Sequence, residues 1–362
     1  MRNNLRLYHK ILELMSQFHP TERITRRRNL ALLMTGLFLS GSVHLAHIVR
    51  KWPLMATLPG LELRLRRFLD NPRLDVGGLY GPLARRLLMR FEGTTTPIRL
   101  LIDTTQLGRD HRMLSVSLAY RKRALPLLWQ VYPKAKGHLS ADEQHAFLER
   151  LRALMPPTEQ PVILLGDSEF GEVDTMRYIR SQGWHFVLRL KGHYSVPTGD
   201  GRWVQLGHMG LQEGQSRYLG PVPLTQKHAY RATVLMHWAS GEKEPWYLAS
   251  DLSGESLLLR HYARRMWTEE LYGDLKGHGF DLGTTRVHGP RRLEALVLGV
   301  ALVYVWLLVL GAKTVKRGQR NLVDRKGRRD HSYFRIGWDF LEHRLRLGLP
   351  IPLNRFSYLC PK

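Results

Sequence analysis

The chain has 362 residues, of which 43% are hydrophobic and 24% charged, so its composition is that of a folded globular protein and excludes wholesale disorder. Its 55 Lys and Arg residues against 31 Asp and Glu residues leave a formal net charge of +24, which favours a polyanion as partner. The one cysteine, Cys360, excludes an intramolecular disulfide and a zinc site built on cysteines, and it fits a reducing cytosol.

The positive charge is concentrated at the two ends of the chain. Residues 1–90 contain 16 Lys and Arg and 5 Asp and Glu, a net charge of +11, and residues 313–362 contain 13 and 4, a net charge of +9. The 222 residues between them carry only +4. Basic flanks of this kind favour contacts with nucleic-acid phosphates over a merely well-solvated surface. Residues 1–19 are polar and basic, so we expect no signal peptide there.

The first segment, residues 1–92, has the spacing of helices. Apolar residues recur at helical spacing between 61 and 69, and the same spacing returns between 83 and 88. Arginines occupy the other faces, among them Arg64, Arg66 and Arg67. We therefore predict an all-helical domain that binds DNA ends, although no specific helix-turn-helix signature is visible.

Residues 93–191 consist of short apolar runs that alternate with helical segments. Strands are expected at 98–102, 113–120, 125–132, 161–165 and 184–190. A capping box at Ser140 and Glu143 predicts a helix that ends near Pro156, and a second helix is expected at 173–182. Strands followed by helices favour an α/β body.

The rest of the chain is expected to complete that body. Glycines and prolines interrupt residues 192–245, which we predict to be a β-rich insertion, and residues 246–312 return to helical spacing from Leu257. Residues 295–312 are long enough and apolar enough to span a membrane, but a helix buried against a sheet is the simpler interpretation in so charged a chain. Residues 313–362 are predicted to be a basic C-terminal tail.

Two aspartates stand out by their position. Asp103 and Asp167 each follow an apolar run, where a carboxylate emerges at the edge of an open α/β sheet. A turn aspartate at the end of a strand is the ordinary interpretation of either one alone. A third acidic residue, Glu269, favours a functional role for the two aspartates, because of the residues around it.

Glu269 lies in a segment that carries several polar side chains at helical offsets. The segment contains Tyr262, Arg265, Glu269 and Lys276. Offsets of 3, 7 and 14 residues from the tyrosine place all four side chains within about 60° of one helical face. That face would present a phenol, a guanidinium, a carboxylate and an ammonium group.

Two interpretations of these residues stay open on spacing alone. A solvated ion-pair ladder needs only Arg265 and Glu269, which are four residues apart. Alternatively, the three carboxylates hold two divalent ions about 4 Å apart, which activate a water or hydroxyl and stabilise the leaving oxygen of a phosphoryl transfer. Mg²⁺ suits such a site because it takes oxygen ligands and keeps several waters. Tyr262, Arg265 and Lys276 would then face substrate phosphates.

The spacing of these residues resembles the Tyr-Arg-Glu-Lys signature of bacterial insertion-sequence transposases, the DDE group that includes the Tn-five-type cut-and-paste enzymes. Residues 164–171 and 183–191 resemble the second-aspartate region of that family, and residues 102–106 resemble its first. More loosely, residues 58–71 resemble its site-binding region. Two positions depart from the family pattern: Ser168 stands where arginine is common, and Met266 where tryptophan often follows the signature arginine.

The resemblance implies an RNase H-like catalytic core formed by residues 93–191 and 246–312, with a β-rich insertion between them. It implies Asp103, Asp167 and Glu269 as the catalytic, metal-binding triad, with two Mg²⁺ ions per active site, for which Mn²⁺ can substitute. Trp246 matches the family's base-stacking tryptophan, and a strand-core residue is the alternative for it.

The implied activity is that of a DNA transposase with endonuclease activity. Such an enzyme binds terminal inverted repeats, excises the element by way of a DNA hairpin, and joins the 3′-OH ends to target DNA. The same resemblance implies a homodimer that holds two element ends and a place in the bacterial cytoplasm at the nucleoid. No contact with membrane is expected, because the apolar segment 295–312 is interpreted as a buried helix. Two alternatives remain: a metal-dependent nuclease of the same fold that does not join strands, and a non-catalytic site-specific DNA-binding protein derived from a transposase. The intact triad argues against the second.

Overall fold

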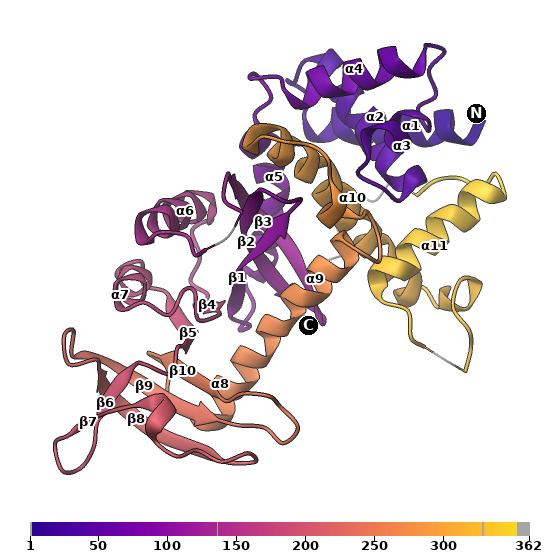
Figure 1. Cartoon of the computed structure of the whole chain (residues 1–362). Helices are drawn as coiled ribbons and strands as arrows, with labels where there is room; N and C mark the ends of the chain where they lie inside the picture. The colour runs from indigo at the N-terminus through magenta and orange to yellow at the C-terminus, as the bar shows by residue number, and fades with distance from the viewer. Residues whose placement is uncertain (1, 136, 328, 353–362) are drawn as a thin grey trace.

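The computed structural model describes residues 2–135, 137–327 and 329–352, so Cys360 lies outside the described residues. At its centre is an eight-stranded mixed sheet with the strand order β3-β2-β1-β4-β5-β10-β9-β8. Helices cover both faces of the first five strands in this order, which confirms the predicted α/β class (Figure 1). The strands of the sheet are β1 (Ile98–Leu107), β2 (His111–Tyr120), β3 (Arg123–Tyr132), β4 (Val162–Gly166), β5 (His185–Leu190), β8 (Ser216–Leu224), β9 (Tyr230–His237) and β10 (Trp246–Ser250).

The described residues before the sheet are helical, as predicted. The helices are α1 (Arg2–Phe18), α2 (Ile24–Ser40), α3 (Leu45–Val49), α4 (Leu58–Leu69) and α5 (Val76–Leu88), followed by the 3₁₀ turn η1 (Met89–Phe91). The carboxylate of Asp75 accepts a hydrogen bond from the Gly78 N–H and so caps α5. The Tyr80 hydroxyl donates to the Pro126 carbonyl on β3 over 2.7 Å. Helix α5 therefore packs directly on the sheet.

Strand β1 organises the first part of the sheet. It pairs antiparallel with β2 and parallel with β4, and β4 pairs parallel with β5. The β2–β3 hairpin turns at Arg121 and Lys122, whose φ angles of 45° and 63° suit a turn that matches the strand twist. The prediction that Asp103 follows a strand is wrong. Pairing with β2 continues as far as Leu107, so Asp103 lies inside β1.

Helices α6 (Ala141–Leu154) and α7 (Val173–Ser181) lie on one side of the sheet (Figure 1). The predicted capping box is present at the start of α6, where Ser140 and Glu143 each accept a hydrogen bond from the other's backbone N–H. On the other side, α8 (Glu255–Tyr262), the 3₁₀ turn η3 (Ala263–Met266) and α9 (Trp267–Leu275) follow one another along one line.

The predicted β-rich insertion extends the main sheet. Strand β10 pairs antiparallel with both β5 and β9, and β9 pairs antiparallel with β8. In the described chain a second, two-stranded sheet is formed by β6 (Ser195–Pro197) and β7 (Trp203–Gln205), which the 3₁₀ turn η2 (Leu206–His208) follows. The strands of the insertion are thus continuous with the strands of the core.

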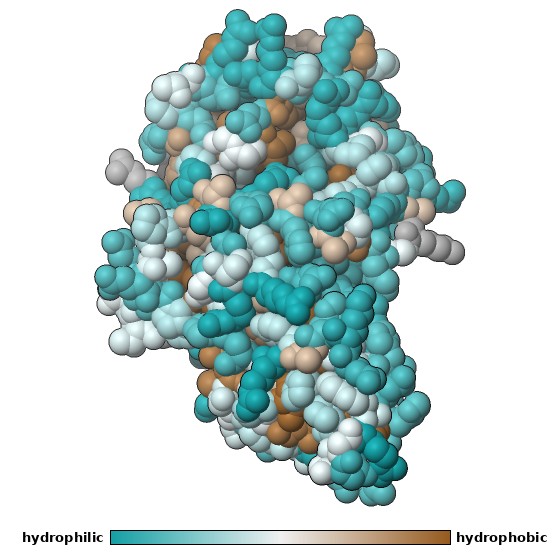
Figure 2. All heavy atoms as spheres, turned by 90° about the vertical axis from the view of Figure 1, so that its left-hand side faces the viewer, coloured by the Kyte–Doolittle hydropathy of each residue, from teal (hydrophilic) through white to brown (hydrophobic). Residues whose placement is uncertain are grey.

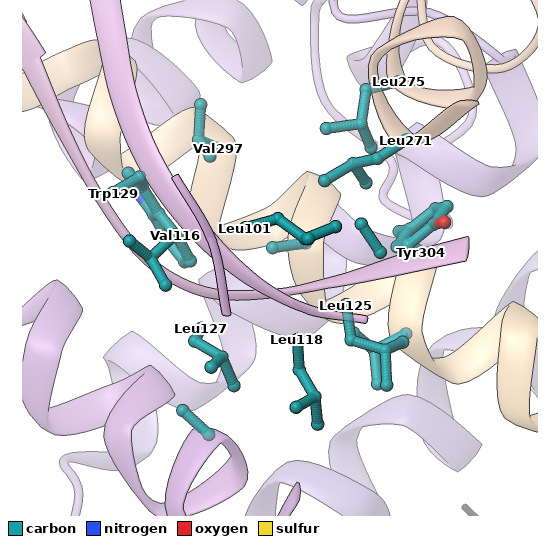
Figure 3. Close-up of a cluster of buried hydrophobic side chains, with 14 of the residues drawn as sticks. Leu101, Val116, Leu118, Leu125, Leu127, Trp129, Leu271, Leu275, Val297 and Tyr304 are labelled. Carbon is teal, nitrogen blue, oxygen red and sulfur yellow. The ribbon is translucent and has the colours of Figure 1, made fainter. Parts of the chain in front are cut away.

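Helix α10 (Pro290–Lys316) lies between the sheet and helices α2 and α11. Of the described helices it alone is long and apolar enough to cross a membrane, and its apolar stretch is wholly buried inside the protein. It packs against β3, α2 and α11 (Tyr333–Arg346). Figure 3 shows Tyr304 of α10 on the same side of the cluster as Leu271 of α9, and Val297 of α10 on the side of Trp129 of β3. The interpretation of this segment as a buried helix is therefore confirmed.

The segment predicted as a basic tail contains a helix of the core. After the 3₁₀ turn η5 (Arg320–Leu322), helix α11 buries Phe334, Trp338 and Leu341. Its closest approach to α10 is at two glycines, Gly311 and Gly337, where an added Cβ would overlap a backbone carbonyl of the facing helix. The prediction missed α11 because charged and glycine-rich residues surround it.

Replacing Gly337 with alanine should lower the free energy of unfolding by about 1–2 kcal/mol. The added methyl group forces α10 and α11 apart, and this cost exceeds the gain of about 1 kcal/mol that alanine brings to a helix. Gly199→Ala is the control, because a Cβ at Gly199 meets no atom within 4 Å. Urea unfolding measures both variants, and a Gly337→Ala midpoint equal to that of the wild type would show that close helix contact contributes nothing.

Candidate active site

Two neighbouring parallel strands bring Asp103 and Asp167 together. The residues that precede them are paired in register between β1 and β4, and each aspartate is the next residue along the chain. Backbone groups hold both carboxylates, since Asp103 accepts from the Thr104 N–H and Asp167 from the Glu169 N–H, each over 2.9 Å. The two carboxylates are therefore fixed at adjacent positions at the same end of the sheet.

Glu269 completes a cluster of three carboxylates, with the Arg265 guanidinium between them. The Nη2 atom of Arg265 is 3.8 Å from an Oδ2 atom of each aspartate. Its Nη1 atom is 3.3 Å from Oε1 of Glu269. The side chain of Arg265 is only 14% exposed, whereas that of Glu269 is 56% exposed. The Arg265–Glu269 pair thus belongs to a larger cluster and is not a solvated ladder.

Burial and like charge would make this cluster unfavourable without a cation. Burial raises the pKa of Asp103 to about 7; Arg265 opposes this rise, and Asp167 adds to it. For Arg265, burial acts to lower the pKa, but the neighbouring carboxylates, Asp103 first among them, raise it above its ordinary value. The guanidinium therefore balances, among others, the negative charge of Asp103, which water hardly reaches.

The four signature residues do not lie on one continuous helix. Tyr262 ends α8, Arg265 lies in η3, Glu269 lies on α9, and Lys276 follows the last residue of α9. The single helical face predicted from 100° per residue is therefore wrong in detail, because a 3₁₀ turn winds more tightly than an α-helix. Lys276 still reaches the site: its Nζ donates to Oγ1 of Thr105 over 2.7 Å.

Tyr262 and Trp246 lie against each other beside the carboxylates. Tyr262 is 2% exposed, and its ring meets that of Trp246 nearly edge to face, with 4.9 Å between ring centroids. Trp246 begins β10 and is half-buried. A base-stacking role for Trp246 stays a prediction, since a half-buried position suits both that role and a place at the edge of the core.

Sequence reasoning missed Tyr272, which lies behind the carboxylates. Its hydroxyl is 2.9 Å from Oγ of Ser115 and 3.4 Å from the carbonyl oxygen of Asp103, and burial raises its pKa well above the ordinary value. The signal was available, because Tyr272 is seven residues after Arg265 and three after Glu269, which is the spacing of the signature face.

Glu169 is a fourth carboxylate of this region, and it supports the site from the other face of the sheet. It is 6% exposed and accepts hydrogen bonds from the Leu139 N–H over 2.9 Å and the Thr104 hydroxyl over 2.7 Å. Arg112 forms an ion pair with it at 3.2 Å. These partners satisfy the carboxylate and fix the residue that follows Asp103 on β1.

The three N-terminal arginines of the sequence analysis lie on α4. Arg64 donates to Oδ1 of Asn29 over 2.9 Å and Arg66 pairs with Glu62, whereas the side chain of Arg67 has no hydrogen bond or ion pair within the described residues. A cleft of about 570 Å³ opens beside α4, lined by His44, His47, Glu62, Arg66, Arg67, Asp70, Arg286, His288 and Arg292 among others. The face of the protein shown in Figure 2 is largely hydrophilic, with apolar side chains in scattered patches.

The carboxylate cluster offers the kind of donors that divalent ions prefer. In the part of the chain that is described, no three His, Cys, Asp or Glu side chains are placed so that they hold a metal ion as they stand. The three carboxylates nevertheless supply only oxygen ligands, which suit Mg²⁺ and Mn²⁺. Because Arg265 lies between them, a divalent ion and this guanidinium are alternative partners for the same charge.

A model of the transposase DDE domain family matches residues 97–306, which is more than half of the chain. The chain belongs to the DDE transposase family. The match begins just before β1 and ends within α10, so it contains all three clustered carboxylates of this transposase. The large mixed sheet of this transposase, with its helices, fits an RNase H-like transposase domain. DDE transposases generally use divalent metal ions. A comparison with curated proteins gave no match.

Replacing Arg265 with glutamine should raise the affinity of the DNA-free transposase for Mn²⁺ about tenfold, because the carboxylates lose their competing cation. Free Mn²⁺, counted by electron paramagnetic resonance during a titration, measures this affinity without any activity assay. Without divalent ions the variant should also unfold at a lower temperature than the wild type, and Mn²⁺ should restore the lost stability.

Arg265→Lys is the matched control for this substitution, since it keeps a positive charge among the carboxylates and should bind Mn²⁺ much like the wild type. If Arg265→Gln and the wild type bound Mn²⁺ equally, the guanidinium and the metal ion would not compete.

Proposed function

We propose that this chain is an insertion-sequence transposase of the Tyr-Arg-Glu-Lys group, which cuts its element free at the terminal inverted repeats and joins the 3′-OH ends to target DNA. The observation that carries the proposal is the convergence of Asp103, Asp167 and Glu269 on one cation, at the junction of β1, β4 and α9. The spacing of the signature residues supports the finer assignment within the family.

In this proposal the three carboxylates hold divalent cations, Mg²⁺ or Mn²⁺. When bound, two such ions activate the attacking hydroxyl and stabilise the leaving oxygen of the phosphodiester. The protein contributes a fixed frame: the Thr104 and Glu169 N–H groups orient the aspartates, and the sheet holds them in register. Glu269, the most exposed of the three, is the ligand nearest to solvent and substrate.

Arg265, Lys276 and Tyr262 are proposed to contact phosphates of the bound strand. Arg265 pairs with the three carboxylates in this structure. If metal ions took its place there, its guanidinium could pair with a phosphate instead. The ammonium group of Lys276 donates to the hydroxyl of Thr105. A phosphate oxygen can replace this hydroxyl as the acceptor, because a hydrogen bond between two charged groups is stronger. The Tyr262 ring meets the Trp246 ring nearly edge to face, so a movement of Trp246 toward a flipped base would also uncover the ring of Tyr262.

The N-terminal helices are proposed to bind the element end. Support comes from the charge of +11 over residues 1–90 and from Arg66 and Arg67, which line the cleft beside α4. Arg286 and Arg292 line the same cleft from the side of the catalytic domain, so one DNA backbone can contact both parts. A homodimer would hold two ends together, as excision of an element in the bacterial cytoplasm requires.

Asp103→Asn, Asp167→Asn and Glu269→Gln should each abolish DNA cleavage, because each removes one ligand charge from the cations while leaving the shape of the side chain. Binding of end DNA should remain close to that of the wild type, since the proposed end-binding residues lie elsewhere. The measurement uses labelled end duplex with Mg²⁺, resolved on denaturing gels, beside a gel-shift assay.

Glu270→Gln is the matched control, because Glu270 is next to Glu269 but pairs with Arg123. Nicking by any of the three triad variants would remove that residue from the proposed site. The same assay separates the alternatives, since a nuclease would nick without joining strands, and a DNA-binding protein would only shift the duplex.

Trp246→Ala should preserve nicking of the first strand and lose most of the hairpin product, because stacking of a base on an aromatic ring contributes about 1–3 kcal/mol. Trp267→Ala is the comparison: Trp267 packs against the core and beside Arg264, so its loss should lower stability instead. Hairpin yield per nicked duplex is the quantity to measure, and a normal yield from folded Trp246→Ala protein would remove Trp246 from this step.

A further inference from the structure

Three arginines near the beginning of β1 have no carboxylate partner among the described residues. Arg99 lies on β1, and Arg260 and Arg264 lie four residues apart on α8 and η3. Arg99 and Arg264 are half-buried, and Arg260 is exposed. We call these three residues the arginine cluster. Buried or half-buried charges in proteins are ordinarily paired, so the cluster lacks negative charge.

The imidazole of His261 lies within the arginine cluster. It is 3% exposed, and Nε of Arg99 donates to its Nδ1 over 3.2 Å. Burial, together with all three guanidinium groups, lowers the pKa of His261 to about 4. Burial and then Arg264 likewise lower the pKa of Arg99 to about 10. The histidine is therefore a neutral acceptor, and the cluster repels itself in the absence of an anion.

Local contacts position the guanidinium of Arg264. Its guanidinium donates to the Arg260 carbonyl oxygen and lies over the Trp267 ring at 5.8 Å from the ring centre. Packing on an aromatic face leaves other N–H groups of the guanidinium directed outward in their plane, where they match phosphate oxygens. The contact lowers the entropy cost of binding an anion.

The arginine cluster and the carboxylate cluster lie on the same side of β1. Arg99 and Asp103 are four residues apart on one strand, so their side chains leave the same face about 13 Å apart. The path from α8 to η3 runs alongside β1, because His261 contacts Arg99 and Arg265 contacts Asp103. A duplex advances about 3.4 Å per nucleotide, so 13 Å corresponds to about four nucleotides.

We propose that the arginine cluster is a second DNA-backbone site, which binds a phosphodiester about four nucleotides from the bond cleaved at the carboxylates. The inference rests on the proposed transposase function. A phosphodiester supplies the negative charge that the three guanidinium groups and the neutral His261 lack, and it forms forked, charge-assisted bonds with arginine. The strand belongs to the element end or to the target DNA, which share this chemistry.

The test is the double variant Arg260→Gln/Arg264→Gln, because both side chains reach the surface and Arg99 is left in place to support the fold. If the strand is the element end, the affinity of this variant for a short end duplex should fall about tenfold. The slope of log affinity against log salt should become shallower by about 0.9 for each phosphate that the protein no longer neutralises. Thermal unfolding without DNA should be unchanged or slightly improved, since the substitutions relieve repulsion.

The matched control is Arg177→Gln/Arg335→Gln, which removes the same charge from arginines paired with Asp174 and Asp339. It should bind DNA with the wild-type salt slope. Replacing the phosphates of the duplex one at a time with a neutral methylphosphonate locates the phosphate that the arginine cluster binds. At that position the replacement should lower the affinity of the wild type for DNA but should not lower that of the double variant any further.

A joining assay with precut ends distinguishes the two strands. Weakened binding of the end duplex assigns the arginine cluster to the element, whereas normal end binding with reduced joining assigns it to the target. End affinity, salt slope and joining all equal to those of the control would overturn the inference. If the wild type and the control also failed to bind end DNA, the proposed function itself would be overturned, and this inference with it.

Discussion

Repulsion among three carboxylates at the meeting point of β1, β4 and α9 is the constraint on which the rest of the site depends. The parallel pairing of β1 and β4 fixes two of them, and side chains buried on both faces of these strands prevent the aspartates from separating. The charge has to be balanced, and Arg265 balances it from a 3₁₀ turn. The anions therefore lie on β1, directly after β4 and on α9, whereas the cation lies on a short 3₁₀ turn.

Two further contacts support the strands that position the aspartates. On one face of the sheet, Glu169 ties the residue after Asp103 to Arg112, and on the other, Tyr272 meets Ser115 on β2. Both contacts are nearly dry, so they keep the strands in place when charges in front of them change. A site of this construction can exchange one cation for another without reshaping its backbone.

Much of the fold was predictable because local signals and tertiary structure agree. Alternating apolar runs gave the strands from β1 to β5, and the capping box at Ser140 gave the start of α6. The extent of β1 was not predictable, since polar residues beyond Asp103 belong to the strand only through pairing with β2. Helix α11 was missed although Phe334, Trp338 and Leu341 have helical spacing, because its basic surroundings dominate the composition.

The site was predictable in its members but not in its arrangement. Spacing identified Glu269 and Arg265 as neighbours on a helix, whereas the contacts of Arg265 with Asp103 and Asp167 join residues almost a hundred or more positions apart. No local pattern carries information of that kind. The break of the signature helix at η3 was equally invisible, because its sequence has no proline or glycine to mark a change of winding.

The close contact between α10 and α11 has a consequence for how the protein folds. The family match ends at residue 306, in the middle of α10. The close contact between α10 and α11 at Gly311 and Gly337 lies beyond that residue. A fragment cut at the family boundary would expose Tyr304 and Trp306, which are fully covered in the whole chain. The family match thus ends inside a helix that the rest of the chain covers, and a fragment that keeps α10 buried has to include α11.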